Sequence, residues 1–164
     1  MNLSEAAAAA DALAERGDER ALADLRAQWA DEVEFAARDA DYRVRALAYR
    51  AVGQFRYRQK LELLRRGLDD ESPAVRGSAL LALELLSRDH PGAVNAVRPR
   101  LHDMANADPN SAVRRLGILC LRNGSPQRDT IVLLSGLAES DEQEADLRAT
   151  ARKVATALTK RSRR

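Results

Sequence analysis

Few side chains in this sequence could carry out acid–base or nucleophilic chemistry. The chain has two histidines, His90 and His102, and one cysteine, Cys120. No His-x3-His, Cys-x2-Cys or paired-carboxylate motif surrounds either histidine, and no glycine-rich loop precedes a Lys-Ser or Lys-Thr pair. Other segments of this chain have a sequence pattern similar to the one around Cys120, and they carry alanine at the equivalent position. This favours a packed, inert thiol over a nucleophile. The sequence therefore predicts no catalytic residue, no cofactor and no metal.

The distribution of charged residues along the sequence is more informative about function than its few potentially reactive side chains. Residues 1–41 contain 11 acidic and 4 basic residues, whereas residues 42–68 contain 8 basic residues and 1 acidic residue, although the whole chain has a net charge of only +2. Such a step creates a local field that can steer an acidic partner. We predict a partner-binding surface here, with Phe55 as an exposed anchor in a turn and Tyr57 at the rim. Its residues are Phe55, Tyr57, Arg58, Lys60, Arg65, Arg66, Arg98 and Arg100. The alternative is that the basic segment is only a solvated face.

Length and composition are those of an ordinary globular protein. The 164 residues are 45% hydrophobic and 32% charged, and only 4% are aromatic, which disfavours a β-sandwich or barrel. No apolar stretch approaches the roughly 18 residues that a membrane span needs, and the acidic N-terminus is unlike a secretory signal. We expect a cytoplasmic protein with no membrane contact, one domain over residues 1–159 and a disordered basic tail over residues 160–164.

One pattern recurs four times along the chain. In each copy an acidic residue is followed five positions later by an apolar residue, then at once by arginine, and then by small residues at helical spacing. The four acids are Asp39, Asp70, Asp108 and Glu142, and the four arginines are Arg45, Arg76, Arg114 and Arg148. Successive arginines are 31, 38 and 34 residues apart. These irregular steps favour helical hairpins with turns of variable length.

Local signals favour helices throughout the chain. Asn2 and Glu5 have capping-box spacing, Gly17 and Gly53 stand where helices are expected to end, and Pro99 is expected to kink its helix near Asn95. The expected helices are residues 3–16, 19–37 with a break allowed near Asp31, 42–52, 57–67, 73–87, 91–105, 111–122, 126–138 and 142–159. The last helix, residues 142–159, is expected to have no partner helix. The predicted fold class is all-α, without strands.

The repeated pattern Asp-x4-Val-Arg-x2-Ala-x2-Ala-Leu resembles the first-helix signature of HEAT-like repeats, over residues 39–155. The resemblance implies an α–α superhelix, or solenoid, of about five helical units whose second helices line a concave face. The acid and arginine of each repeat are expected to meet between adjacent repeats and to act as structural braces. This predicted ladder consists of Asp39, Arg45, Asp70, Arg76, Asp108, Arg114 and Arg148.

The resemblance also implies a function class. Most such solenoids are non-catalytic scaffolds for protein–protein interaction, and the charge step favours a protein or peptide partner with an acidic segment bound to the concave face. Two other classes stay open. The arginines could bind a nucleic-acid backbone, as in AlkD-type DNA glycosylases, although the acidic first 41 residues would repel a duplex. An enzyme or accessory resembling the phycobilin lyases would need a ligand pocket and a reactive group, and the sequence identifies neither.

Overall fold

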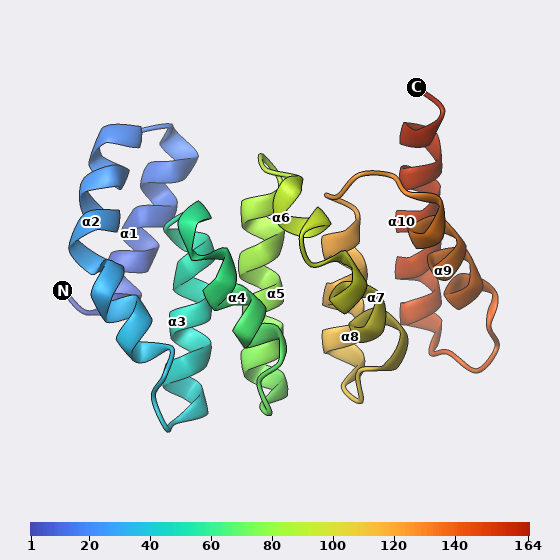
Figure 1. Cartoon of the computed structure of the whole chain (residues 1–164), viewed down its shortest axis with the longest axis horizontal. Helices are drawn as coiled ribbons and strands as arrows, with labels where there is room; N and C mark the ends of the chain where they lie inside the picture. The colour runs from blue at the N-terminus through green and yellow to red at the C-terminus, as the bar shows by residue number, and fades with distance from the viewer. The chain divides into compact units, whose positions relative to one another are not determined.

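The computed structural model describes residues 1–164 and is built entirely from helices (Figure 1). The absence of strands confirms the predicted all-α class. The elements are α1 (Leu3–Arg16), α2 (Glu19–Ala36), α3 (Tyr42–Gln54), the short 3-10 helix η1 (Arg58–Lys60), α4 (Leu61–Leu68), α5 (Pro73–Ser87), α6 (Gly92–Asn95), α7 (Arg98–Ala107), α8 (Ser111–Leu121), α9 (Arg128–Glu139) and α10 (Ala145–Ser162). None of these helices is long and apolar enough to cross a membrane.

The helices form two compact units, Met1–Leu86 and Ser87–Arg164. In the first unit α1, α2 and α3 pack against one another, and α3 also contacts α4. In the second unit α7 packs against α8, and α10 packs against both α9 and α8. That residues 1–159 fold as one domain stays a prediction.

Local hydrogen bonds set several helix ends. The Asn2 side chain accepts from the Glu5 N–H at 2.8 Å, and the Glu5 carboxylate accepts from the Asn2 N–H at 3.0 Å, so the predicted capping box is present. Gly17 ends α1 with a φ of 73°, a left-handed conformation that glycine adopts without a Cβ clash. Asp41 and Asn110 cap α3 and α8 through their side chains.

Three local predictions were wrong. Helix α2 runs without a break through Asp31. Gly53 lies inside α3 and does not end it. Residues 160–162 continue α10 and are not a disordered tail, because Arg161 donates to the carbonyl oxygens of Arg122 and Gly124 at 2.5 and 2.7 Å and so ties the end of the helix to the rest of its unit.

The segment predicted as one kinked helix over residues 91–105 is two helices. Helix α6 ends at Asn95 and α7 begins at Arg98, so the disruption falls next to the predicted kink. Pro99 lies in the first turn of α7, where its missing N–H leaves no hydrogen bond unmade. The chain therefore starts a new helix at the proline.

Small residues allow the helices to approach closely. The small position three residues after each motif arginine is buried in all four copies, at Ala48, Ala79, Gly117 and Ala151. Gly53 lies especially close to a neighbouring helix, since a Cβ there would lie 2.5 Å from the Ala82 Cα of α5. The helices of this unit are thus spaced by residues that have little or no side chain.

Candidate partner-binding surface

The motif acids close the loops that precede the first helix of three repeats. Each carboxylate accepts a hydrogen bond from the backbone N–H two residues later. The pairs are Asp39 with Asp41 at 2.8 Å, Asp70 with Ser72 at 2.9 Å and Asp108 with Asn110 at 2.9 Å. The same local turn therefore recurs because the same residue type stands at the same position.

Arg45 connects two repeats. Its Nη1 donates to the carbonyl oxygens of Asp39 and Ala40 at 3.0 Å each, and its Nε and Nη2 donate to the two carboxylate oxygens of Asp70, again at 3.0 Å each. Both side chains are only 13% exposed. The predicted contact between an acid and an arginine of adjacent repeats is therefore present for this pair, in the bidentate geometry that guanidinium and carboxylate favour.

This contact affects the ionisation of Asp70. Burial acts to raise its pKa, but the hydrogen bonds from Arg45 and from the Ser72 N–H, with the charges of Arg45 and Arg76, outweigh burial and hold the pKa below its ordinary value. Arg76 repeats half of the Arg45 pattern, since its Nη1 donates to the carbonyl oxygens of Asp70 and Glu71 at 3.0 and 3.1 Å. Asp70 is therefore held by the arginines of two successive repeats.

The two C-terminal motif arginines are bound differently. Arg114 donates from Nε to the Ala105 carbonyl oxygen at 3.0 Å, and Arg148 lies 3.7 Å from the Asp141 carboxylate. The Nη2 of Arg114 and the Nε of Arg148 are buried without a hydrogen-bond partner. That all four arginines act as braces stays a prediction.

Phe55 and Tyr57 are not at an exposed rim, and this part of the predicted surface was wrong. Phe55 is 0% exposed and Tyr57 is 3% exposed, with their rings stacked at a centroid distance of 5.1 Å. The Tyr57 hydroxyl donates to the Arg26 carbonyl oxygen at 2.7 Å, and Arg26 Nε donates to the Phe55 carbonyl oxygen at 2.6 Å. Burial raises the pKa of Tyr57 to about 12. These two residues attach the turn after α3 to α2.

Part of the charge step is neutralised within the first unit. Arg56, which has a φ of 58°, donates to Asp11 at 2.8 Å and to Glu15 at 3.3 Å, both on α1. Lys60 donates to Glu34 on α2 at 2.8 Å and lies over the Tyr57 ring at 5.2 Å. The side chain of Lys60 is only 13% exposed. Acids of the first helix pair and bases of the following segment therefore form ion pairs with each other.

Arg98 was also predicted to contact a partner, but it is buried, with 6% exposure. Its guanidinium donates to Thr130 Oγ1 at 3.0 Å and to the Asn95 side chain, and Thr130 also hydrogen-bonds His102 Nε2 at 2.8 Å. Burial lowers the pKa of Arg98, and burial followed by the charge of Arg98 lowers the pKa of His102. Arg100, by contrast, is half-buried.

Three residues of the predicted surface are exposed in the first unit. Arg58 belongs to η1, and Arg65 and Arg66 belong to the outer side of α4. Glu62 lies one turn before them, 3.8 Å from Arg65 Nε at its nearest oxygen. The exposed part of the predicted surface is thus a short cationic stretch formed by Arg58, Arg65 and Arg66, which we call the α4 arginine surface.

The most exposed aromatic residue is Phe35, which was not among the residues predicted from the sequence to form the surface. Its side chain is 79% exposed at the end of α2, and Tyr42 at the start of α3 is 49% exposed. The helical pattern contained the signal. Phe35 follows the buried Val33 by two residues, which places it about 200° around the helix, on the opposite face.

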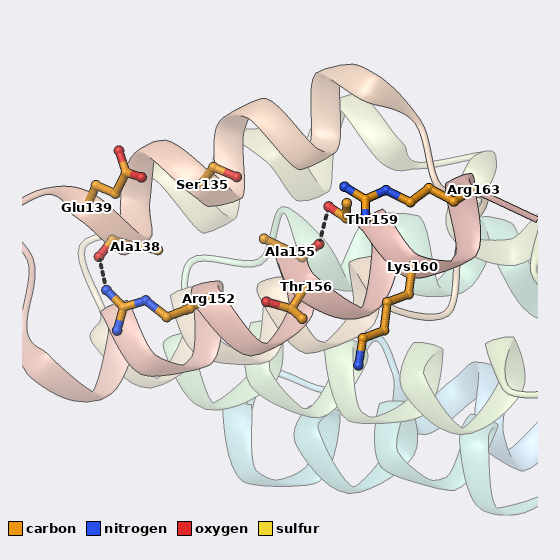
Figure 2. Close-up of a pocket in the computed structure, with 9 residues that line it drawn as sticks. All are labelled: Ser135, Ala138, Glu139, Arg152, Ala155, Thr156, Thr159, Lys160 and Arg163. Atoms are coloured by element: carbon orange, nitrogen blue, oxygen red, sulfur yellow. Dashed lines mark hydrogen bonds between the residues drawn. The ribbon is translucent and has the colours of Figure 1, made fainter.

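The second unit has a shallow cavity between α9 and α10, of about 290 Å³ (Figure 2). Its lining is mixed, with Glu139 and Ser135 on α9, Arg152, Thr156 and Lys160 on α10, and Arg163 just after the end of α10. Arg152 donates to the Ala138 carbonyl oxygen at 3.0 Å and so spans the two helices. No group of three or more histidine, cysteine or acidic side chains is placed to hold a metal ion.

Comparison with known families agrees with this architecture. Residues 33–107 match the family model described as HEAT repeats, a segment that runs from the end of α2 through α7 and contains the motif copies at Arg45 and Arg76. No curated protein matches the chain. That match supports a HEAT-like repeat family for this part of the chain; HEAT repeats generally serve as scaffolds for protein interaction and are typically not enzymes.

Proposed function

We propose that this protein is a non-catalytic scaffold that binds an acidic segment of a partner protein through the α4 arginine surface. The main observation is exposure: Arg58, Arg65 and Arg66 are exposed to solvent, whereas Arg45, Arg56 and Lys60 of the same segment are largely covered and paired with acids inside the unit. Exposed guanidinium groups can pair with the carboxylates of a partner in the bidentate geometry that both favour.

The family and the chemistry of the chain both support a scaffold. HEAT repeats generally mediate protein interactions. Arginine is also favoured at the centre of protein interfaces, where its guanidinium can pair with a carboxylate in bidentate geometry. Association with an acidic partner should therefore be accelerated at low salt and slowed as salt screens the charges.

The experiment is capture of partners on the immobilised protein, with and without nuclease, followed by titration of the captured protein against variants. The double variant Arg58→Glu/Arg65→Glu reverses two charges of the α4 arginine surface. We expect association to be at least about 10-fold weaker, with the largest difference at low salt. Circular dichroism should show an unchanged helical spectrum, since both side chains are exposed.

The matched control is Arg115→Glu/Arg128→Glu, which makes the same charge change at two exposed residues of the second unit. It should bind the partner nearly as wild type does. Equal affinity of the wild-type protein and the Arg58/Arg65 variant for the captured partner would refute the proposed surface. A ligand that disappears with nuclease and shows a steep log–log salt dependence would support the nucleic-acid alternative.

A further inference from the structure

The charged side chains that line the cavity between α9 and α10 form no salt bridge within the chain. Three of them are basic, Arg152, Lys160 and Arg163, and one is acidic, Glu139, so the lining has a net charge of +2. Arg152 makes one hydrogen bond, from Nη2 to the Ala138 carbonyl oxygen at 3.0 Å, although a guanidinium has five N–H donors. The cavity therefore presents cationic donors that a ligand from solvent can use.

The two arginines lie at opposite ends of this cavity (Figure 2). Arg152 is inside α10, and Arg163 comes just after its last residue. At a rise of about 1.5 Å per residue, roughly 16 Å of helix length separates them. Lys160 is one turn before Arg163 and lines the same end. The positive charge thus falls at two separate places along one side of the cavity.

Between these ends the cavity has hydroxyl groups and small side chains. Ser135 on α9 and Thr156 on α10 belong to its two walls, and neither hydroxyl is hydrogen-bonded within the chain (Figure 2). Thr159, by contrast, donates to the Ala155 carbonyl oxygen at 2.8 Å. Ala138 and Ala155 are buried lining residues. A peptide backbone in this cavity could therefore hydrogen-bond to both walls while it packs on alanine.

Neither solvation nor the helix dipole accounts fully for this arrangement. The negative end of the α10 dipole favours the bases in and after its last turn, but it does not act on Arg152, which is in the middle of the helix. An exposed base on a flat helix face needs only water around it. These bases instead border a cavity formed by two helices, where a ligand can contact both walls at once.

We propose that the cavity between α9 and α10 binds an extended acidic segment of a partner protein, with one carboxylate at Arg152 and another at Arg163. An extended chain advances about 3.3 Å per residue, so acidic residues four or five positions apart are about 13–17 Å apart. This separation matches the distance along α10 between the two arginines. Each guanidinium can hold its carboxylate in bidentate geometry.

The position of Glu139 favours a peptide over a nucleic acid. Glu139 lines the cavity on α9, next to the residue whose carbonyl oxygen binds Arg152. A nucleic-acid strand carries a phosphate at every nucleotide and would bring one of them close to this carboxylate, whereas a peptide can place a neutral residue there. The site shares no residue with the α4 arginine surface, so it goes beyond the proposed function and can be tested apart from it.

The test uses an array of synthetic Gly/Ser peptides that carry two glutamates, from adjacent positions to seven positions apart. A second array has glutamine in their place. We expect the strongest binding at a separation of four or five positions, and in fluorescence polarisation this peptide should bind at least about 10-fold more tightly than its glutamine counterpart. Equal binding of the two arrays, or binding that does not depend on the separation, would overturn the proposal.

Three variants test the residues of the cavity. Arg152→Gln/Arg163→Gln should weaken binding of the best peptide at least about 10-fold, and Arg163→Gln alone, which breaks no hydrogen bond of its side chain within the chain, at least about 3-fold. Glu139→Gln should strengthen binding, because it removes a like charge from the lining. Circular dichroism should show the wild-type spectrum for all three. Unchanged affinity of a folded Arg163→Gln protein would refute the role of that end of the cavity.

Two control variants separate this site from other basic surfaces. Arg115→Gln/Lys153→Gln removes two exposed charges of the same unit outside the cavity and should bind the peptide as wild type does. Arg58→Glu/Arg65→Glu should also leave peptide binding unchanged; a loss in this variant and not in the cavity variants would assign the peptide to the α4 arginine surface.

Two comparison ligands test the chemistry of the occupant. Succinate is too short to reach both arginines and should compete with the peptide no better than acetate at equal carboxylate concentration. Competition by succinate as strong as that of the peptide would overturn the extended segment as the occupant. Tighter binding of a single-stranded oligodeoxythymidine that is lost in Arg152→Gln/Arg163→Gln would overturn the assignment to a protein partner.

Discussion

The close approach of α3 to α5 makes Gly53 sensitive to the addition of any side chain. A Cβ added at Gly53 would lie 2.5 Å from the Ala82 Cα, 3.0 Å from its Cβ and 3.1 Å from its carbonyl oxygen. Carbon atoms in ordinary contact are about 3.5–4.0 Å apart. Gly53→Ala therefore requires the two helices to separate by about 1 Å. The obstacle is backbone, which cannot rotate away as a flexible side chain can.

The magnitude follows from two opposing effects. Overpacking of this kind costs about 1–3 kcal/mol, and the rigid obstacle places Gly53→Ala near the upper end. Alanine regains about 1 kcal/mol through its higher helix propensity. The free energy of unfolding should thus fall by about 2 kcal/mol, which corresponds to a loss of about 4–8 °C in melting temperature for a chain of this size.

Gly136 provides a matched control for the same substitution. It also lies inside a helix, α9, but a Cβ there would meet no atom within 4 Å. Gly136→Ala should therefore show the propensity gain alone, about 0.5–1 kcal/mol, and melt about 1–4 °C higher than wild type. Thermal and urea unfolding followed by circular dichroism measure both variants. A Gly53→Ala protein as stable as wild type, beside a stabilised Gly136→Ala protein, would refute the close approach of α3 and α5.

Three further outcomes are expected. Arg76→Ala removes the hydrogen bonds to the carbonyl oxygens of Asp70 and Glu71. The free energy of unfolding, measured in urea, should fall by ~1–3 kcal/mol. A variant that keeps full stability but loses partner binding would show that Arg76 is a contact residue. The lowered pKa of His102 means that the unfolded chain takes up a proton there more readily than the folded protein does. This contribution to stability is present above about pH 6.5 and is lost as the pH falls, so stability curves from about pH 7.5 to 5 should be flatter for His102→Gln than for wild type. Cys120 is 0% exposed, and a thiol reagent should label it slowly in the folded protein and rapidly in urea; rapid native labelling would show that the thiol is accessible.

Local signals in the sequence determined the helices. Asn2 and Glu5 form their predicted capping box, and Gly17 adopts the left-handed conformation that ends α1. Each of these depends on residues within one helical turn, so no knowledge of the rest of the chain is needed. The repeat pattern likewise indicated HEAT-like repeats, and the family match over residues 33–107 supports that interpretation.

The candidate site depended on contacts that sequence spacing does not reveal. Phe55 lies in a turn, where exposure is the ordinary expectation, yet α2 covers it and Arg26 binds its carbonyl oxygen from 29 residues away. The sequence does change from an acidic segment, residues 1–41, to a basic one, residues 42–68. Much of this basic segment does not form an exposed surface, because Arg56 binds Asp11, 45 residues away, and Lys60 binds Glu34, 26 residues away.

The sequence by itself therefore determined the fold class, the approximate positions of most helices and the repeat. The tertiary structure decided which charges reach solvent: Arg58 and Arg66 do, whereas Lys60 and Arg98 are largely or wholly covered. It also formed the cavity between α9 and α10, whose lining comes from both helices. The physical reason is that helix formation depends on neighbours within a few residues, whereas burial and ion pairing depend on distances in space, which only packing of the helices sets.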